Sequence, residues 1–424
     1  MTMSEWSKTR LGNIAETTSG GTPDRKNQAF FGGPIPWVKS GELEDTFIND
    51  TEEKITLEGL EASSAKLFPP GTMLMAMYGA TVGKTALLKI EAATNQAVCA
   101  IFPKSDQART DFLRYALVYQ RPEILKLRYG GAQPNISQQV IRNLAVPVPP
   151  IPEQRKIASV LGLVQRAIEQ QERLIALTTE LKKSLMRKLF TEGLRGEPQK
   201  QTEIGPVPES WEVKLLRDCC IVQTGIAKGR KVAASEALTL PYLRVANVQA
   251  GHLDLSEMKT ITIRHKEKDR YLLRKGDVVL TEGGDFDKLG RGFIWNGEID
   301  ECVHQNHIFA VRVDRSQLIP EYFAHLSQSP YGKAYFLSVA HKTTNLACIN
   351  TTKLKGFPVL IPTLDEQGEI VQVLGTVNAK LTQQVEKRRS LSDLFRTLLH
   401  QLMTAQIRIH DVDLSFLEED TVAS

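Results

Sequence analysis

One segment occurs twice in this chain. Residues 148–168 read VPPIPEQRKIASVLGLVQRAI, and residues 361–381 read IPTLDEQGEIVQVLGTVNAKL. The pair Glu153-Gln154 recurs as Glu366-Gln367, and the apolar positions that follow recur at the same spacing. Each copy closes a stretch of similar length, so one half of the molecule repeats the other. We therefore expect two similar units related by approximate internal twofold symmetry.

Composition limits the class of protein. A chain of 424 residues with 42% hydrophobic content can bury two or three ordinary cores. The formal net charge of +4 permits a nucleic-acid partner but does not argue for one by itself. The five cysteines are odd in number and form no Cys-x-x-Cys pair, as expected of reduced thiols. No stretch approaches the roughly 20 apolar residues that cross a bilayer, so we expect a cytoplasmic protein without membrane contact.

Glycine, proline and charge patterns predict an alternation of globular and helical parts. Residues 1–150 are rich in Gly and Pro, with short apolar β-type runs at 72–77 and 97–102. After Pro152, a residue suited to the first turn of a helix, the composition changes to Glu, Gln, Lys, Arg and Leu. We predict a first mixed α/β domain at 1–150, a long helix at 151–192, a linker at 193–210, a second domain at 211–363, a second long helix at 364–408 and a C-terminal tail at 409–424.

Each predicted helix has a narrow apolar stripe. The first has a 4-3-4 row and then a second, shifted row: Ile157, Leu161, Val164 and Ile168, followed by Leu177, Leu181, Leu185 and Leu189. The second helix repeats this plan with Ile370, Leu374, Val377 and Leu381, followed by Leu391, Leu394, Leu398 and Leu402. About 38 residues would make a rod of roughly 57 Å, and its stripe must be removed from water. We predict that the two helices pair with each other as an antiparallel coiled coil; packing on their own domains, or pairing between two chains, are the alternatives.

The two domains correspond at scaffold positions and differ between them. The matching segments are Pro36-Trp37-Val38-Lys39 with Pro241-Tyr242-Leu243-Arg244, Gly83-Lys84 with Gly290-Arg291, Asn95-Gln96 with Gln305-Asn306, and Ile136-Ser137 with Ile349-Asn350. One scaffold with two different surfaces would recognise an asymmetric, bipartite target. Duplex DNA read at two half-sites has the matching geometry.

Four features follow one another in a fixed order. They are Ser19-Gly20-Gly21-Thr22-Pro23, the segment Ile35-Pro36-Trp37-Val38-Lys39-Ser40-Gly41, Gly83-Lys84-Thr85 before Asn95-Gln96, and the doubled Pro-x-x-x-Glu-Gln-x-x-Ile that leads into a long helix. With them, nearly the whole chain resembles the specificity subunit of type I restriction-modification enzymes.

The resemblance implies two target-recognition domains separated by antiparallel helices, each domain reading one half of a split DNA site. It also implies that the helices dock two methyltransferase subunits and that translocase-endonuclease subunits join this core. The chain would direct the adenine methylation or the restriction that these partner subunits carry out. The chain itself would bind double-stranded DNA without catalytic residues, a cofactor or a metal. The second domain has Thr224-Gly225-Ile226-Ala227 in place of Gly-Gly-Thr-Pro, which leaves the role of that loop open.

Two other functions stay open on the sequence. One is a stand-alone DNA-binding regulator without methyltransferase partners. The other is a nucleotide-binding enzyme, because residues 78–85 read YGATVGKT and approach a phosphate-binding loop, although their glycine spacing is one residue short.

Polar residues in the loops of each domain are the candidates for DNA contacts. Amide side chains can read adenine, and Arg or Lys can read guanine, through paired hydrogen bonds. The candidates in the first domain are Thr22, Lys39, Ser40, Lys84, Asn95, Gln133 and Asn135. Those in the second domain are Arg230, Arg244, Asn247, Arg291, Gln305, Lys342, Thr343 and Asn345. For each, the alternative is an ordinary polar residue of a turn.

Overall fold

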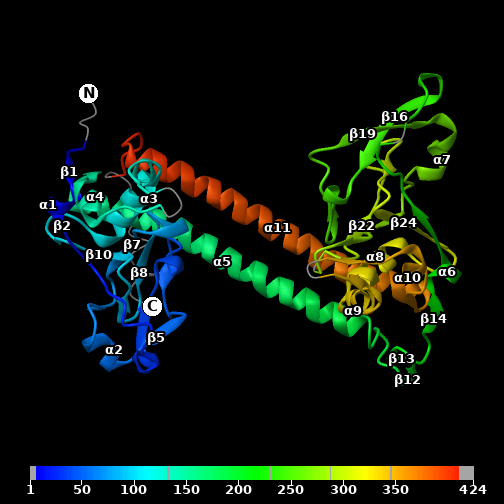
Figure 1. Ribbon diagram of the computed structural model, residues 1–424, viewed down its shortest axis with the longest axis horizontal. Coiled ribbons are helices and arrows are strands. Elements are labelled where there is room, and N and C mark those ends of the chain that lie inside the picture. The colour runs from blue at the N-terminus through cyan, green and yellow to red at the C-terminus, as the bar shows by residue number, and fades with distance from the viewer. Residues whose placement is uncertain (1–5, 131–133, 230, 287, 344–345, 410–424) are drawn as a thin grey trace. The chain divides into compact units, whose positions relative to one another are not determined.

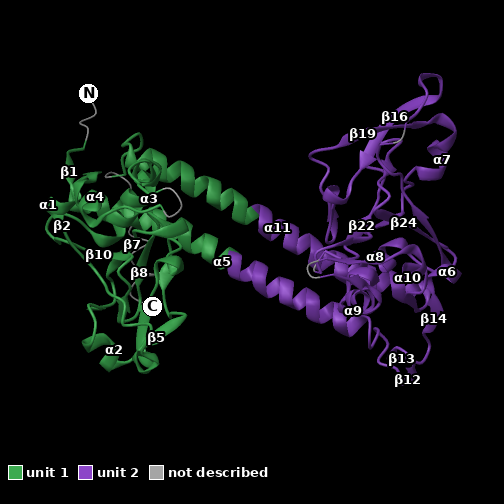
Figure 2. Cartoon of the chain, in the orientation of Figure 1, with its two compact units in different colours: residues 1–171, 387–424 green, residues 172–386 purple. Residues whose placement is uncertain are grey.

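The computed structural model describes residues 6–130, 134–229, 231–286, 288–343 and 346–409 (Figure 1). The chain divides into two compact units: unit 1 comprises residues 1–171 and 387–424, and unit 2 comprises residues 172–386 (Figure 2). Unit 2 is therefore one continuous stretch of chain, whereas unit 1 is assembled from two. The long helices α5 (Ile151–Leu189) and α11 (Leu364–Met403) each begin in one unit and end in the other.

The globular part of unit 1 contains two mixed sheets and a short ribbon. Its strands are β1 (Lys8–Arg10), β2 (Ala15–Ser19), β3 (Phe31–Val38), β4 (Phe47–Ile48), β5 (Glu53–Ile55), β6 (Leu67–Phe68), β7 (Met73–Ala76), β8 (Thr85–Leu88), β9 (Ala92–Thr94), β10 (Val98–Pro103) and β11 (Ala145–Pro147). Its helices are α1 (Leu11–Ile14), α2 (Leu57–Glu61), α3 (Thr110–Lys126) and α4 (Gln138–Asn143), with short 3-10 turns η1 (Gln28–Phe30), η2 (Ser40–Glu42) and η3 (Gly79–Thr81). The larger sheet has the order β2-β10-β7-β8-β4, the smaller one β5-β3-β9-β6, and β1 pairs with β11.

Strand β7 shows why the apolar run at 72–77 becomes a central strand. Met73 and Met75 belong to one hydrophobic cluster, and Leu74 and Ala76 belong to another. Because alternate side chains of a strand point to opposite faces, both faces of β7 are buried and the sequence shows no polar alternation. The β-type runs predicted at 72–77 and 97–102 are confirmed as β7 and β10.

Unit 2 repeats this architecture. Its strands are β12 (Gln199–Thr202), β13 (Gly205–Pro208), β14 (Glu212–Leu215), β15 (Cys220–Thr224), β16 (Ala237–Leu243), β17 (Val248–Gln249), β18 (His252–Leu253), β19 (Lys259–Arg264), β20 (Val278–Thr281), β21 (Gly283–Gly284), β22 (Gly292–Ile294), β23 (Val303–His304), β24 (Ile308–Val313), β25 (His341–Lys342), β26 (Ala347–Cys348) and β27 (Pro358–Ile361). Its helices are α6 (Leu216–Cys219), α7 (Lys268–Tyr271), α8 (Pro320–Gln328), α9 (Pro330–Val339) and α10 (Thr351–Lys355), with 3-10 turns η4 (Ala234–Glu236), η5 (Val245–Asn247) and η6 (His265–Glu267). The sheets have the orders β15-β24-β20-β22 and β19-β16-β23, and β14 pairs with β27.

The two units follow the same chain path. In unit 1, β3 pairs antiparallel with β5 and parallel with β9, and in unit 2, β16 pairs in the same two ways with β19 and β23. The backbone N–H of Asn95 donates to the carbonyl of Val38 at 2.9 Å, and that of Gln305 donates to Leu243 at 3.0 Å. The predicted internal repeat, and the predicted match between these two loops, are confirmed.

The long helices pack against each other within unit 1. Ile157 and Leu161, from the first half of α5, share a hydrophobic cluster with Leu399 and Leu402, from the end of α11. The start of one helix thus lies with the end of the other, which is the antiparallel arrangement predicted from the sequence.

The same arrangement recurs in unit 2. Met186 and Leu189, from the end of α5, belong to the same core cluster as Ile370 and Leu374, from the start of α11.

Within the described residues, none of the helices combines the length and the apolar character needed to span a membrane.

The second leucine row of each helix is buried only at its end, at Leu189 and Leu402, so the prediction was wrong for the earlier part of each row. Leu177 and Leu181 of α5 are 58% and 53% exposed, and Leu394 of α11 is 45% exposed. The 4-3 spacing instead continues through Gln171, which is buried, and Thr178, which is half-buried. The buried side of a paired helix keeps a period of 3.5 residues, even where its residues are polar, and Leu177, Leu181 and Leu394 lie on another face.

A buried glutamine accounts for the repeated Glu-Gln pair. Oε1 of Gln154 accepts a hydrogen bond from the N–H of Arg109 at 2.8 Å, and its Nε2 donates to the carbonyls of Gln107 and Pro149 at 3.0 and 2.8 Å. Gln367 makes the same three bonds to the equivalent backbone groups of unit 2, at 2.8, 2.9 and 2.9 Å. Since both side chains are fully buried, each amide fixes the first turn of a long helix to the domain of its own unit.

Candidate nucleic-acid interface

In unit 1, the loops that contain the predicted DNA-contacting residues lie against one another. The N–H of Gly21, in the loop after β2, donates to the carbonyl of Thr94 at 2.9 Å. The hydroxyl of Thr81, in η3, donates to the carbonyl of Ser40 at 2.7 Å. The loops that follow β2, β3, β7 and β9 therefore form one joined surface, although they are distant in sequence.

A close backbone approach explains the first glycine of the Gly-Gly-Thr-Pro segment. A Cβ atom on Gly20 would lie 2.0 Å from the carbonyl oxygen of Thr94. A Cβ atom on Gly225 would lie 2.1 Å from the carbonyl oxygen of His304. The second domain therefore keeps the glycine that the packing requires and varies only the residues after it.

Lys39 is held by carboxylates of its own domain. Its ammonium group lies 2.8 Å from the carboxylate of Glu52 and 3.0 Å from that of Glu53. Hydrogen bonds to Glu52 and Glu53 raise the pKa of Lys39. A phosphate or a base would have to compete with these two partners for the charge.

Arg244 and Asn247 shape the equivalent turn, η5, in unit 2. The guanidinium of Arg244 donates to the carbonyl of Glu257 at 2.7 Å, and its side chain is 16% exposed. Asn247 is buried; its Oδ1 accepts from the N–H of Arg244 at 3.0 Å, and its Nδ2 donates to the carbonyls of Asp254 and Glu257. These bonds fit an ordinary polar residue of a turn better than a residue that contacts DNA.

Lys84 and Arg291 occupy matching turns with different surroundings. Lys84 forms an ion pair with Glu44. The Nε of Arg291 is buried and has no hydrogen-bond partner within the described residues. Within the described residues Arg291 has no carboxylate partner, so its charge is not balanced in the way that the charge of Lys84 is.

The segment 78–85 does not have the architecture of a phosphate-binding loop. Such a loop leads into a helix whose first N–H groups hold the phosphate. Here Lys84 is followed by strand β8. The alternative of a nucleotide-binding enzyme loses its basis at this turn.

Three other candidates use one polar atom within their own domain. The hydroxyl of Thr22 donates to Oε1 of Gln96. Oδ1 of Asn95 accepts from the backbone N–H two residues later at 3.1 Å, and Oε1 of Gln305 accepts from the N–H of Val245 at 3.2 Å. The NH2 groups of these two half-buried amides donate no hydrogen bond within the described residues, so these donors have no partner in their own domain.

The remaining candidates differ in how they are placed. Lys342 and Thr343 are exposed at the hairpin of β25 and β26. Asn135 exchanges two backbone hydrogen bonds with Tyr129, at 2.9 and 3.0 Å. Gln133, Arg230 and Asn345 lie outside the described residues.

Exposed aromatic residues lie in these loops and were not among the candidates. Tyr78, Tyr129 and Phe286 are 43%, 55% and 41% exposed. Asn135 forms β-bridges with both tyrosines, and Phe286 follows β21 in unit 2. Aromatic rings can stack on bases. An aromatic residue directly before a glycine, as in Tyr78-Gly79, was the signal in the sequence for the two tyrosines.

Comparison with known proteins gives consistent matches. The family model for the type I restriction modification DNA specificity domain matches residues 3–179 and 208–389. The type I restriction enzyme MjaIX specificity subunit of Methanocaldococcus jannaschii is 27% identical over 299 residues, which cover 68% of each chain. The MjaVIII specificity subunit of the same organism is 23% identical over 421 residues, covering 96% of this chain and 94% of that one. The crystal structure of the type I restriction-modification S subunit from M. genitalium has a similar fold, with a TM-score of 0.58, 16% sequence identity, and coverage of 95% of this chain and 97% of that chain.

Proposed function

This chain belongs to the type I restriction modification DNA specificity family, and we propose that it selects the DNA site on which a type I restriction-modification complex acts. Each unit reads one part of a bipartite, asymmetric DNA sequence. The chain binds the DNA without bond chemistry of its own, and adenine methylation and restriction are carried out by partner subunits. The complex works in the cytoplasm, where cellular DNA is accessible to it.

The observation that carries this proposal is one fold present twice with different loop residues. Both units keep a glycine where the loop backbone passes close to a carbonyl oxygen, at Gly20 in unit 1 and at Gly225 in unit 2. The cation of the next matching turn changes from Lys84, which is paired with Glu44, to Arg291. Because base recognition depends on which donors and acceptors reach the groove, two such surfaces favour two different half-sites.

An exposed leucine row supports a partner on the long helices. Leu174, Leu177 and Leu181 of α5 are 47%, 58% and 53% exposed. Their spacing of three and four residues places them on one face of the helix, and contiguous exposed apolar residues mark interaction sites. The position equivalent to Leu181 in α11 is Leu394, which is 45% exposed. The positions equivalent to Leu174 and Leu177 are Lys387 and Ser390, so the α11 face is less apolar. We assign the leucine face of α5 to one methyltransferase subunit and the equivalent, more polar face of α11 to a second, with the translocase-endonuclease subunits joining that assembly.

Methylation mapping tests the proposal directly. Genomic DNA from cells with this gene and its neighbours is sequenced for modified adenine and compared with DNA from cells that lack this gene alone. Methylation at a two-part motif should disappear with the gene. An unchanged pattern would contradict the proposal and favour the stand-alone regulator, which would bind DNA by itself and leave no methylation behind.

A further inference from the structure

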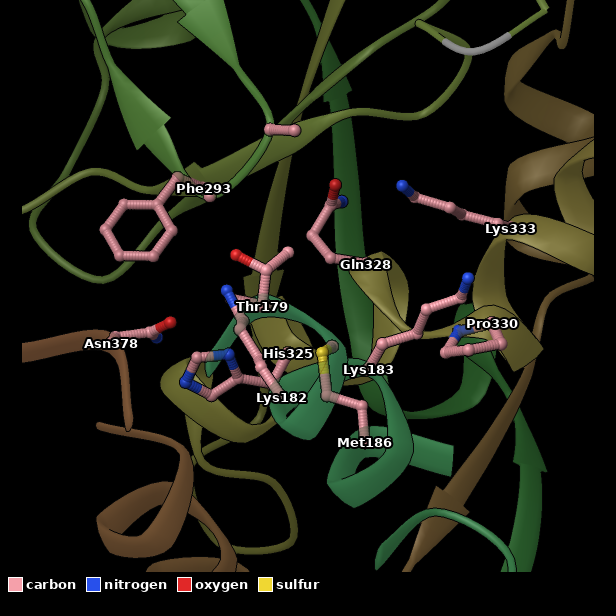
Figure 3. A pocket seen from close by; sticks show the side chains of 13 residues that line it. Thr179, Lys182, Lys183, Met186, Phe293, His325, Gln328, Pro330, Lys333 and Asn378 are labelled. Carbon is pink, nitrogen blue, oxygen red and sulfur yellow. The ribbon is translucent and has the colours of Figure 1, made fainter. Parts of the chain in front are cut away.

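Unit 2 contains a cationic cavity beside the end of α5. Its volume is about 360 Å3. Lys182 and Lys183 enter it from α5, His325 from α8 and Lys333 from α9 (Figure 3). No carboxylate is among the described residues that line it.

The equivalent place in unit 1 is filled by side chains. The guanidinium of Arg114 donates to the carbonyl of Asp45 at 2.6 Å and to Oε1 of Gln165 at 3.1 Å, and Nε2 of Gln165 also donates to the Asp45 carbonyl, at 2.9 Å. Next to this network, the rings of Tyr115 and Phe395 pack with their centroids 6.0 Å apart. Long polar and aromatic groups therefore close this space.

The internal repeat identifies the residues that replace them in unit 2. The equivalent bonds align Arg109 with Ile319 and Gln154 with Gln367. Counting from these pairs, Ala324 of α8 corresponds to Arg114 of α3, and Asn378 of α11 corresponds to Gln165 of α5. His325 and Lys182 take the places of Tyr115 and Phe395. Since Ala324 and Asn378 are shorter than their counterparts, the space they leave becomes the cavity.

The three lysines that face this cavity have no balancing anion among its described lining residues. Lys182, Lys183 and Lys333 form no ion pair within the described residues. Burial, together with the nearby charge of Lys333, lowers the pKa of Lys182. Burial, with Lys182 close by, also lowers the pKa of His325 to about 4. Lys182 is half-buried, whereas Lys183 and Lys333 are exposed. Their like charges repel one another at the cavity, and a bound anion would offset that repulsion.

We propose that this cavity binds a phosphate ester, with the phosphate among Lys182, Lys183 and Lys333. The apolar side chains of Met186 and Phe293 line the remaining space and would contact the sugar or base. A cavity of about 360 Å3 lies in the usual size range of small-ligand sites. The ester is either a free nucleotide or a nucleotide unit of a DNA strand. This site is additional to sequence recognition and does not depend on it.

Calorimetric titration of the full-length chain with ADP and with pyrophosphate tests the proposal. We expect one equivalent to bind, and Lys182→Met to weaken binding at least tenfold. Lys188→Met is the matched control, because Lys188 lies on the same helix, outside the cavity lining, with a side chain 69% exposed; it should bind as the unchanged chain does. Absence of binding to both probes, or equal binding by Lys182→Met, would overturn the proposal.

A second variant separates loss of the site from loss of the fold. Ala324→Met places a longer side chain in the cavity and leaves the three lysines and His325 in place. It should abolish probe binding while the thermal unfolding temperature stays the same or rises. Unchanged binding by this variant would show that the probes bind elsewhere and would also overturn the proposal.

Competition with DNA distinguishes the two sources of the ester. If a DNA strand occupies the cavity, a random-sequence duplex should displace pyrophosphate, and Lys182→Met should lower the salt slope of DNA binding by about one. If the ligand is a free nucleotide, DNA and the probe should bind independently. The titration contains no DNA, so a negative result would reject the cavity site without rejecting the proposed selection of DNA sites. A negative result in methylation mapping would likewise leave the cavity site untouched.

Discussion

Glu366, in the first turn of α11, accepts a hydrogen bond at 2.7 Å from the backbone N–H of Leu194, just beyond the end of α5. Its other oxygen accepts from Nε1 of Trp211 at 3.2 Å. The equivalent residue of α5, Glu153, accepts two bonds from Arg408, beyond the end of α11, at 2.7 and 3.1 Å. Each glutamate of the repeated Glu-Gln pair thus ties the start of one long helix to the chain that follows the other.

Loss of the Glu366 carboxylate should destabilise the protein. Glu366→Ala leaves the buried Nε1 of Trp211 and the N–H of Leu194 without their acceptor, at an expected cost of about 2–4 kcal/mol in the free energy of unfolding. Urea denaturation measures the change. Glu369→Ala, at the half-exposed ion pair with Arg195, is the control and should change stability by less than about 1 kcal/mol. Equal effects of the two substitutions would contradict this role of Glu366.

The exposed leucine row should matter for assembly and not for folding. Leu177→Gln with Leu181→Gln removes apolar surface that already faces water in this chain, so the thermal unfolding temperature should stay nearly constant. Co-purification with the methyltransferase subunits should be lost. The control is Glu180→Gln, because Glu180 is also exposed and lies between the two leucines. Normal assembly of the double variant would exclude this face as the docking surface.

Lys342 and Asn247 should respond differently in DNA binding. Lys342 is exposed on β25, and Lys342→Ala should weaken binding to all sequences and reduce the slope of log K against log salt by about one. Asn247 is buried and bonded within its turn, so Asn247→Ala should lower the unfolding temperature and leave the salt slope unchanged. Fluorescence anisotropy over a series of KCl concentrations gives both slopes, and a reversed pattern would disprove the assignment.

Acid should destabilise the protein through His304. Burial lowers the pKa of His304 from 6.5 to about 4. Between these values the unfolded chain binds a proton that the folded chain does not, so the free energy of unfolding falls as the pH falls. The loss from this residue should reach about 2 kcal/mol at pH 5. Urea denaturation at pH 7 and pH 5 should show a smaller loss for His304→Gln; an identical loss would mean that His304 is not buried in its neutral form.

The scaffold could be predicted because its signals are local and occur twice. The Glu-Gln pair, the start of each helix and the apolar run of β7 each appear in the sequence at the right spacing. The outward face of α5 could not be predicted in the same way, because Leu177 and Leu181 look more apolar than Gln171 and Thr178. Leucine content alone does not distinguish a helix face that is buried within the chain from one that is exposed and can bind another protein.

The DNA-contacting candidates show a different limit of prediction. Residue type directs attention to the polar loops, but Lys39 is paired with Glu52 and Glu53, and Lys84 is paired with Glu44. Such partners are remote in sequence, so the charge of a side chain does not tell whether that charge is already balanced. Only the folded arrangement separates these residues from Arg291.

The division of the chain also has a consequence for its synthesis. A ribosome releases residues 1–171 first, but the helical segment that completes unit 1 starts at residue 387. Until that segment emerges, Ile157 and Leu161 lack the cover of Leu399 and Leu402. Unit 2, being continuous, can close while the last part of α11 is still being translated. Unit 1 is therefore synthesised first and completed last. A truncated mRNA that ends before residue 387 would produce an incomplete unit 1 with exposed apolar residues, which chaperones and proteases could bind.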